Sequence, residues 1–210
     1  MIALVTGTGT AVGKTWFTAR AIESLAAEGV RAAARKPAQS FAPGDGAPTD
    51  ADVLGAASGE DPGSVCPAHR WYPVGMAPPM AAEVLAREAF TIAELVAELA
   101  PSDRACTFVE SAGGVRSPLA SDGDTVDLCR ALAPDIVVLV ADAGLGMINA
   151  VRLSVAALPG HDLVVALNRY DDTNELHRAN ATWLRDVDAL TVVTSPAALA
   201  HHIGASIATA

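Results

Sequence analysis

The sequence predicts an α/β protein with a doubly wound, mainly parallel sheet that has helices on both faces. Short apolar runs alternate along the chain with segments of about ten residues that have helical character. The run from Asp135 to Ala141 is almost continuously apolar and β-branched, as expected for a strand that is covered on both faces. Polar residues that could do chemistry follow the predicted strand ends, where ligands bind in sheets of this kind.

The composition fits one folded domain over residues 1–210, with 51% apolar and only 4% aromatic residues. The formal net charge of −10 argues against a nucleic-acid partner, which requires a basic face. Cys66, Cys106 and Cys129 lack metal-ligand spacing and indicate ordinary thiols in a reducing cytoplasm. Ile2 to Val5 is too short for a signal peptide, and no apolar run reaches membrane-spanning length, so we expect no membrane partner.

The predicted elements alternate in chain order. Phe41–Thr49 is expected to be a loop, Cys66–Pro79 to be irregular because of its prolines, and Thr91 to begin a helix through a capping box. His201 and His202 in the tail are expected to be solvated. The predicted strands are Ile2–Val5, Arg31–Arg35, Thr107–Val109, Asp135–Ala141, Leu163–Leu167 and Leu190–Val193. The predicted helices are Lys14–Ala27, Asp50–Ser58, Met80–Glu88, Thr91–Leu99, Asp124–Leu132, Ile148–Leu158 and Asn174–Leu184.

The first fifteen residues carry the clearest functional signal. A buried strand, a Gly/Thr-rich turn and a helix that begins at Gly-Lys-Thr can hold a polyphosphate through inward-facing N–H groups and the helix N-terminus. Lys14 is placed to reach the terminal phosphates and the Thr15 hydroxyl to bind Mg²⁺. Five residues rather than the usual four separate Gly7 from Gly13, and the alternative is a turn without a ligand. The expected nucleotide-binding residues are Gly9, Thr10, Ala11, Val12, Gly13, Lys14 and Thr15.

Other candidate residues follow later strands. Lys36 offers a second positive charge, or is an ordinary surface lysine. Glu110 and one of Asp50 and Asp52 offer oxygen ligands suited to Mg²⁺. Alternatively, one of these aspartates caps a helix and both are solvated. Gly113-Gly114 either forms only a tight turn or lets a ligand approach the backbone.

Six motifs occur in a specific order along the chain: Val5-Thr-Gly-Thr-Gly-Thr-Ala-Val-Gly-Lys-Thr15, Lys36-Pro-Ala-Gln-Ser40, Thr49-Asp-Ala51, Val109-Glu-Ser-Ala-Gly-Gly114, Leu145-Gly-Met-Ile-Asn149 and Asn168. Together they resemble dethiobiotin synthetase over about the first 170 residues. A phosphate loop with five residues between its glycines is this family's form. The resemblance implies a P-loop NTPase-like fold and an ATP-dependent carbon–nitrogen ligase of the cytoplasm.

The resemblance implies ureido ring closure on 7,8-diaminopelargonate with ATP, Mg²⁺ and CO₂, a late step in biotin synthesis. A substrate amine takes up CO₂ as a carbamate, whose oxygen attacks the γ-phosphate to give a carbamic-phosphoric anhydride. The second amine then closes the ring, giving dethiobiotin, ADP and phosphate. The family works as a homodimer with the substrate across the interface.

The resemblance also assigns roles to residues. Lys14 neutralises the γ-phosphate, and Lys36 holds the carbamate and the transferring phosphoryl group. Asn168 contacts adenine. The remaining assignments are Mg²⁺ for Thr15, Asp50 and Glu110; the substrate's reacting end for Thr10 and Ser40; the substrate for Gly113; and the substrate carboxylate of the neighbouring subunit for Leu145, Gly146, Ile148 and Asn149. For Asn149, expected at a helix start, the alternative is a plain N-cap.

Three positions depart from the family pattern. Ala11 stands where many members have glutamate, Phe41 where they have glycine, and Ser111 where they often have glycine. These departures keep open a redirected or non-catalytic paralogue that binds nucleotide. A partner-switching P-loop ATPase is a further alternative, but such proteins typically have a second lysine in the loop, and Thr8–Ala11 contains none. Val193-Thr-Ser-Pro-Ala197 also departs from the family pattern where that pattern lies near the nucleotide base. The sequence therefore leaves the nucleotide preference open, and ATP is taken as the default.

Overall fold

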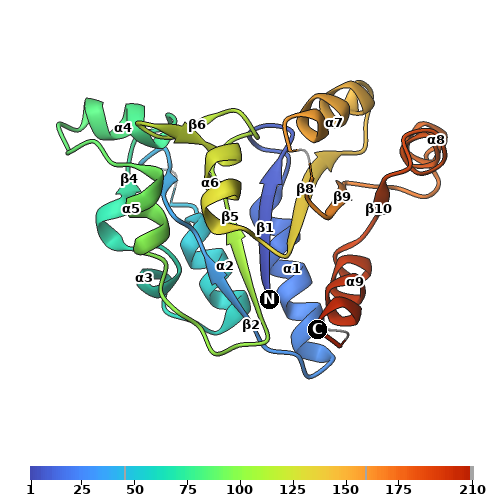
Figure 1. The fold of residues 1–210 in the computed structure, drawn as a ribbon, viewed down its shortest axis with the longest axis horizontal. Helices are drawn as coiled ribbons and strands as arrows, with labels where there is room; N and C mark the ends of the chain where they lie inside the picture. Colours follow the sequence, from blue (N-terminus) through green and yellow to red (C-terminus); the bar gives the residue numbers. More distant parts are fainter. Residues whose placement is uncertain (45, 159, 209–210) are drawn as a thin grey trace.

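A computed structural model describes residues 1–44, 46–158 and 160–208 of the chain. Its strands are β1 Ile2–Gly7, β2 Ala32–Arg35, β3 Gln39–Ser40, β4 Trp71–Tyr72, β5 Cys106–Glu110, β6 Pro118–Ala120, β7 Gly123–Asp124, β8 Ile136–Asp142, β9 Leu163–Asn168 and β10 Thr191–Val193. Six of them form a parallel sheet in the order β10-β9-β8-β1-β5-β2 (Figure 1). The other four form two small pairs, β3–β4 and β6–β7.

The helices cover both faces of this sheet. Their bounds are α1 Lys14–Ala27, α2 Asp50–Ser58, α3 Pro62–Val65, α4 Pro78–Val84, α5 Ile92–Ala97, α6 Thr125–Leu132, α7 Met147–Ala156, α8 Glu175–Asp186 and α9 Pro196–Ala208, with a 3₁₀ turn η1 at Ala68–Arg70. Because strand side chains alternate, Ala3 and Val5 pack into the core beneath α1, α2 and α9, whereas Leu4 packs into the core beneath α4 to α8. The predicted doubly wound α/β fold is confirmed. Among the described helices, none is both long and apolar enough to cross a membrane.

The chain turns away from β1 in two directions. It passes through α1 to β2 on one side of the sheet and later reaches β8 on the other side, so β1 is the point where the strand order reverses. The carboxyl ends of the parallel strands share one edge, the upper edge in Figure 1. The register places Glu110 beside Val5 and Asn168 beside Asp142 at this edge. This is where ligands bind in doubly wound sheets.

The expectation that both histidines of the tail are solvated is confirmed for His201 but not for His202. Residues 196–208 form α9, whose Leu199, Ala200 and Ile203 are buried against the core that α1 also covers. His201 is exposed, but His202 is half-buried, and its Nε2 has no hydrogen-bond partner among the described residues. In the sequence, the few large apolar residues of this helix are separated by alanines, so no distinct apolar face with a helical period can be recognised.

The stretch predicted to be irregular also contains short elements. Cys66–Pro79 includes η1 and β4, and α4 begins at Pro78, earlier than predicted, because prolines fit the first turn of a helix. That helix ends at Val84 rather than Glu88, just before Ala86 adopts a positive φ of 53°. Strands β3 and β4 pair over two residues each, too few for a side-chain period to show in a sequence.

Candidate active site

The phosphate loop connects β1 to α1 and has a positive φ at two positions, Ala11 and Gly13. Gly13, the N-cap of α1, has φ +91°, a conformation that favours glycine, and a Cβ there would lie 2.0 Å from Asn168 Nδ2. Ala11 has φ +59° despite its side chain. Within the described residues no side chain caps α1, so its first N–H groups remain available to an anion.

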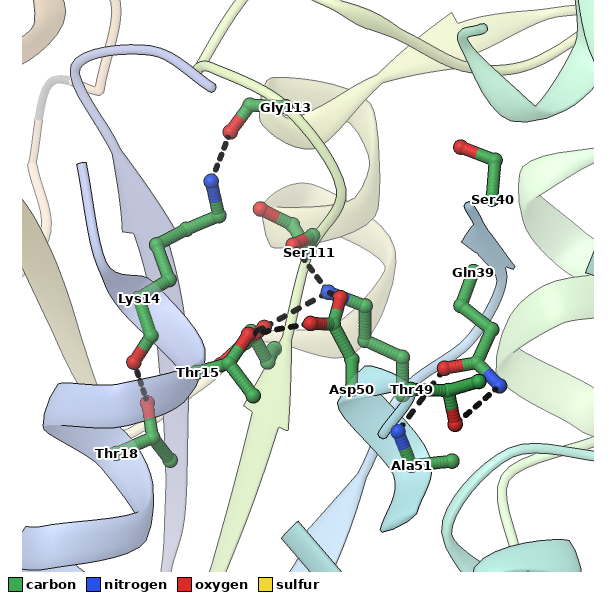
Figure 2. Close-up of polar contacts among 12 residues, drawn as sticks. Lys14, Thr15, Thr18, Gln39, Ser40, Thr49, Asp50, Ala51, Ser111 and Gly113 are labelled. Carbon is green, nitrogen blue, oxygen red and sulfur yellow. Dashed lines mark hydrogen bonds and ion pairs between the residues drawn. The ribbon is translucent and has the colours of Figure 1, made fainter. Parts of the chain in front are cut away.

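Lys14 extends from the start of α1 along the inside of the loop (Figure 2). Its Nζ donates to the carbonyl oxygens of Gly9 at 3.1 Å and Gly113 at 2.7 Å. No carboxylate lies within ion-pair distance of it among the residues that the structure describes. Burial, together with the charge of Lys36, lowers the pKa of Lys14 to about 8. The charge of this lysine is therefore poorly compensated until an anion binds.

Lys36 lies in a different environment, between two carboxylates. Its Nζ donates to Glu110 Oε1 at 2.7 Å, to Asp50 Oδ2 at 2.7 Å and to the Ser111 carbonyl at 3.3 Å. Burial alone would lower the pKa of Lys36, but the charges of Glu110 and Asp50 outweigh it and raise that pKa above its usual value. For Asp50 the effects have the opposite signs: burial alone would raise its pKa, but the charge of Lys36 holds that pKa below its usual value. Lys36 and Asp50 are therefore both charged near neutral pH.

Three oxygen atoms converge beside this lysine. Thr15 Oγ1 lies 2.8 Å from Asp50 Oδ1 and 2.7 Å from Glu110 Oε1, but a hydroxyl carries only one proton to donate. Glu110 is fully buried, and its Oε2 has no partner among the described residues. A hard cation would relieve both features, and Mg²⁺ prefers such oxygen ligands together with phosphate and water. The residues therefore fit a Mg²⁺ site formed by Thr15, Asp50 and Glu110.

Asp50 and Asp52 have different surroundings. The N-cap of α2 is Thr49, not an aspartate as one alternative from the sequence held, and Asp52 completes the capping box with it. The amide of Gln39 holds the same turn: its Oε1 accepts from the Ala51 N–H at 2.9 Å, and its Nε2 donates to Thr49 Oγ1 at 3.3 Å. These contacts direct Asp50 toward Lys36 and leave Asp52 at the helix start.

A cavity of about 540 Å³ opens over the loop and this cluster. The candidate residues that line it are Thr10, Ala11, Gly13, Lys14, Thr15, Lys36, Ser40, Asp50, Glu110 and Gly113. Ser40 Oγ donates to the Met76 carbonyl at 2.5 Å, which ties one wall to the stretch before α4. Phe41 lines the same wall. Ser111 does not line the cavity, and its buried hydroxyl has no hydrogen-bond partner within the described residues.

A second cavity, of about 580 Å³, lies on the other side of the loop. Its wall includes Asn168, which also donates from Nδ2 to the Val12 carbonyl at 2.9 Å. Trp16 is half-exposed and lines both cavities. The structure thus places the expected base-contacting residue next to the loop. Gly9 and Val12, although part of the loop, line neither cavity.

The segment before and at the start of α7 lines neither of these two cavities. Leu145 is 89% exposed and Asn149 is exposed, whereas Ile148 packs partly against the core. The N-cap of α7 is Gly146, with φ +88°, so the plain N-cap alternative for Asn149 is wrong. Asn149 stands at the third residue of the helix instead.

Sequence reasoning gave no role to three residues that the structure places at the site. Gln39 positions the start of α2, Trp16 separates the cavities, and Arg169 contacts the loop. A polar residue at a predicted strand end was the available signal for Arg169, which directly follows Asn168. No local sequence pattern indicates a role for Gln39, because its hydrogen-bond partners lie ten or more residues away in the sequence. None indicates a role for Trp16 either, because its role is to line two cavities that only the fold creates.

Comparison with known proteins identifies the family. A family described as AAA domain matches residues 3–204. The ATP-dependent dethiobiotin synthetase BioD of Anaeromyxobacter sp. (strain Fw109-5) is 40% identical over 179 residues, which cover 81% of this chain and 78% of that protein. The protein of the same name from Haloferax mediterranei is 36% identical over 197 residues, covering 91% and 82%.

Solved structures support the fold alone. Chloroplast FtsY from Physcomitrella patens aligns with a TM-score of 0.53 at 13% identity, over 97% of this chain and 64% of that one. FtsY from Elizabethkingia anophelis aligns with a TM-score of 0.50 at 13% identity, over 96% of this chain and 64% of that one. The sequence matches and the phosphate-loop geometry together show that the chain belongs to the family of ATP-dependent dethiobiotin synthetases, which are P-loop ligases.

Proposed function

We propose that this protein closes a ureido ring on 7,8-diaminopelargonate with ATP, Mg²⁺ and CO₂, giving dethiobiotin, ADP and phosphate. One observation carries the proposal: Lys14, Lys36 and the Thr15–Asp50–Glu110 oxygens line a single cavity over the phosphate loop. The names of the relatives supply the reaction class. A cavity with two cations and a cation-binding oxygen cluster suits the transfer of a phosphoryl group.

The loop and α1 would hold the nucleotide. Backbone N–H groups and Lys14 would bind the β- and γ-phosphates, and the second cavity with Asn168 would receive the adenine. Thr15, Asp50 and Glu110 would hold Mg²⁺, which when bound neutralises charge on the transferring phosphoryl group. Lys14 has carbonyl partners that a phosphate can replace without breaking an ion pair.

The diamine would enter the first cavity with its reacting end against Thr10, Ser40 and Gly113. The free amine and CO₂ form a carbamate, and a carbamate oxygen attacks the γ-phosphorus while ADP leaves. The second amine then attacks the carbamoyl carbon of the anhydride and expels phosphate, with loss of the amine protons. Lys36 remains protonated because its pKa is raised, so it pairs with the carbamate and phosphoryl oxygens and does not act as a base.

Residues Leu145, Gly146, Ile148 and Asn149 would serve a neighbouring subunit. They line neither of the two cavities described above, and no side chain caps the start of α7 among the described residues, which suits a carboxylate. We therefore propose a homodimer of single-domain cytoplasmic subunits in which each α7 caps the carboxylate of the substrate bound next to the other loop.

The deciding experiment measures phosphate release from MgATP and bicarbonate, with and without 7,8-diaminopelargonate. Diamine-dependent release, with the ureido product identified by mass spectrometry, is the expected result. Nucleotide binding without diamine-dependent release would contradict the proposed function.

A second candidate is the same chemistry on a different diamine. Phe41 favours it, because it lines the wall beside Ser40 at the position where the family motif expected from the resemblance has glycine. A panel of diamines of different chain length, assayed with the wild type and Phe41→Gly, separates the two. Faster turnover of another diamine by the wild type, reversed in the variant, would favour this second candidate.

A further inference from the structure

Two consecutive side chains at the end of β9 hold two consecutive carbonyls of the phosphate loop. Asn168 Nδ2 donates to the Val12 carbonyl at 2.9 Å. Arg169 Nη2 donates to the Ala11 carbonyl at 3.1 Å. In a planar trans peptide the C=O and the following N–H point in opposite directions. Turning these two carbonyls toward β9 therefore turns the N–H groups of Val12 and Gly13 away from it, toward the inside of the loop.

The backbone at both ends of the arginine contact is strained. Ala11 has φ +59° and Arg169 has φ +56°, a region that costs energy for residues with a side chain. Such conformations persist where surrounding contacts hold them, and they cluster at functional sites. Here the contact that joins the two strained residues is the one that fixes the Ala11–Val12 peptide.

The arginine is itself held in place. Its Nη1 donates to Asp142 Oδ2 at 2.7 Å, and Asp142 Oδ1 accepts from the Gly144 N–H at 2.9 Å. The hydrogen bond from Arg169, followed by that from Gly144, keeps the pKa of Asp142 below its usual value, so the carboxylate stays charged. Asn180 Nδ2 fixes the same turn by donating to the carbonyls of Ala143 at 3.0 Å and Gly144 at 3.1 Å. A continuous set of hydrogen bonds thus runs from the loop to the turn before α7.

We infer that Arg169 is a positioning residue that presets the phosphate loop for nucleotide binding, with Asp142 as the support that orients its guanidinium. The inference rests on the proposed function only in that the loop binds nucleotide. It adds a link between the loop and the turn that leads into α7, the segment proposed to serve the neighbouring subunit.

A matched surface pair provides the control. The side chains of Arg169 and Asp142 are 58% and 46% exposed, and exposed ion pairs contribute little to stability. Arg152 makes a comparable contact with Asp188, 2.6 Å between Nη2 and Oδ1, and lines neither cavity. Removing Arg169 should leave the melting temperature nearly unchanged and should affect the loop. Removing Arg152 should not affect the loop, although it should cost some stability because the side chain of Asp188 is only 13% exposed.

The test is calorimetric titration of the full chain with MgATP, inorganic triphosphate and adenosine. Arg169→Ala should weaken MgATP and triphosphate about tenfold, the effect of losing one charge-assisted hydrogen bond. Arg169→Lys should recover part of the lost affinity. Asp142→Asn should weaken the binding of both ligands about threefold by the same reasoning. Arg152→Ala should bind both ligands as tightly as the wild type. Because Asp142 lines neither cavity, its effect reports positioning rather than direct contact.

The double variant Arg169→Ala/Asp142→Asn should bind no more weakly than Arg169→Ala alone, because the support has no function without the arginine. Wild-type triphosphate affinity in Arg169→Ala would overturn the inference. So would a loss confined to adenosine, which would make Arg169 a base contact, and so would additive effects of the two changes. None of these titrations uses a diamine, so failure of the proposed reaction would leave their outcome readable.

Discussion

Two buried lysines lie on the two sides of one cavity and differ in what surrounds their charges. Lys14 has two backbone carbonyls as partners, and its pKa is lowered to about 8 by burial and by the nearby charge of Lys36. Lys36 has Glu110 and Asp50, and their charges raise its pKa in spite of burial. Both lysines are buried, with 7% of Lys14 and 2% of Lys36 exposed, so the carboxylates in direct contact with Lys36 account for most of the difference.

The comparison separates two functions of charge in a phosphoryl-transfer site. A lysine without a counter-ion gains most from an anionic ligand, so the Lys14 region is suited to bind phosphate. A lysine held between two carboxylates also orders the site: Lys36 fixes Asp50 and Glu110 next to Thr15, and its charge keeps the pKa of Asp50 low. Each prediction below breaks or sharpens this contrast.

The largest effect is expected from Lys14→Met. The variant lacks the positive charge that would stabilise the negative charge developing on the phosphoryl oxygens. Diamine-dependent phosphate release should therefore fall by about a thousandfold, the upper range for removing one preorganised donor. The melting temperature should change little, because only hydrogen bonds to two carbonyls are lost. Near-wild-type turnover would remove Lys14 from the mechanism.

Lys36→Met should instead destabilise the fold. It leaves the fully buried Glu110 and the partly exposed Asp50 without their cation, and breaking such a pair costs about 3 kcal/mol. Urea unfolding should show this loss, and the double variant Lys36→Met/Glu110→Gln should recover part of it. If Lys36→Met and Lys14→Met unfold at the same urea concentration, the contrast between the lysines is wrong.

The two aspartates of α2 should behave differently. Asp50→Asn should raise the Mg²⁺ concentration needed for half-maximal activity about tenfold, because it removes one charged oxygen ligand. Asp52→Asn should leave this value unchanged and reduce stability by about 1 kcal/mol through the weakened capping box. Equal shifts in Mg²⁺ dependence would contradict the assignment of Asp50 as the ligand.

The smallest effect is a pH dependence from Lys14. Bound phosphate favours the charged lysine, so MgATP binding above pH 8 should take up close to one proton, and the affinity should fall as the pH rises from 8 to 9. In the absence of nucleotide, the free energy of unfolding changes with pH in the opposite direction to the affinity. The folded pKa of about 8 lies below the ordinary value of 10.5, so the unfolded chain holds more protons between these values and stability rises with pH.

Calorimetric titration in buffers of different ionisation enthalpy measures the proton uptake. Lys14→Met should abolish it. Lys36 should not contribute in this window, because its pKa is raised and the group stays protonated throughout. Proton uptake that persists in Lys14→Met would assign the titration to another group.

The sequence by itself determined the parallel sheet and the phosphate loop. Both depend on local patterns: continuous apolar strands, a Gly-rich turn and Gly-Lys-Thr at a helix start. The order of the motifs also placed Lys36, Asp50 and Glu110 at strand ends or near them. Parallel strands share one edge for their carboxyl ends, which is why these distant residues meet.

Only the tertiary structure decided how the side chains share the site. Asp50 rather than Asp52 faces Lys36 because Gln39, from another strand, fixes the turn before α2. Helix α9 forms because its few large apolar residues find a core face beside α1, which no local period indicates. The opposite pKa directions of Lys14 and Lys36, and the hold of Arg169 on Ala11, arise from contacts between residues far apart in the chain. Electrostatics and loop geometry depend on such distances, which the order of residues does not contain.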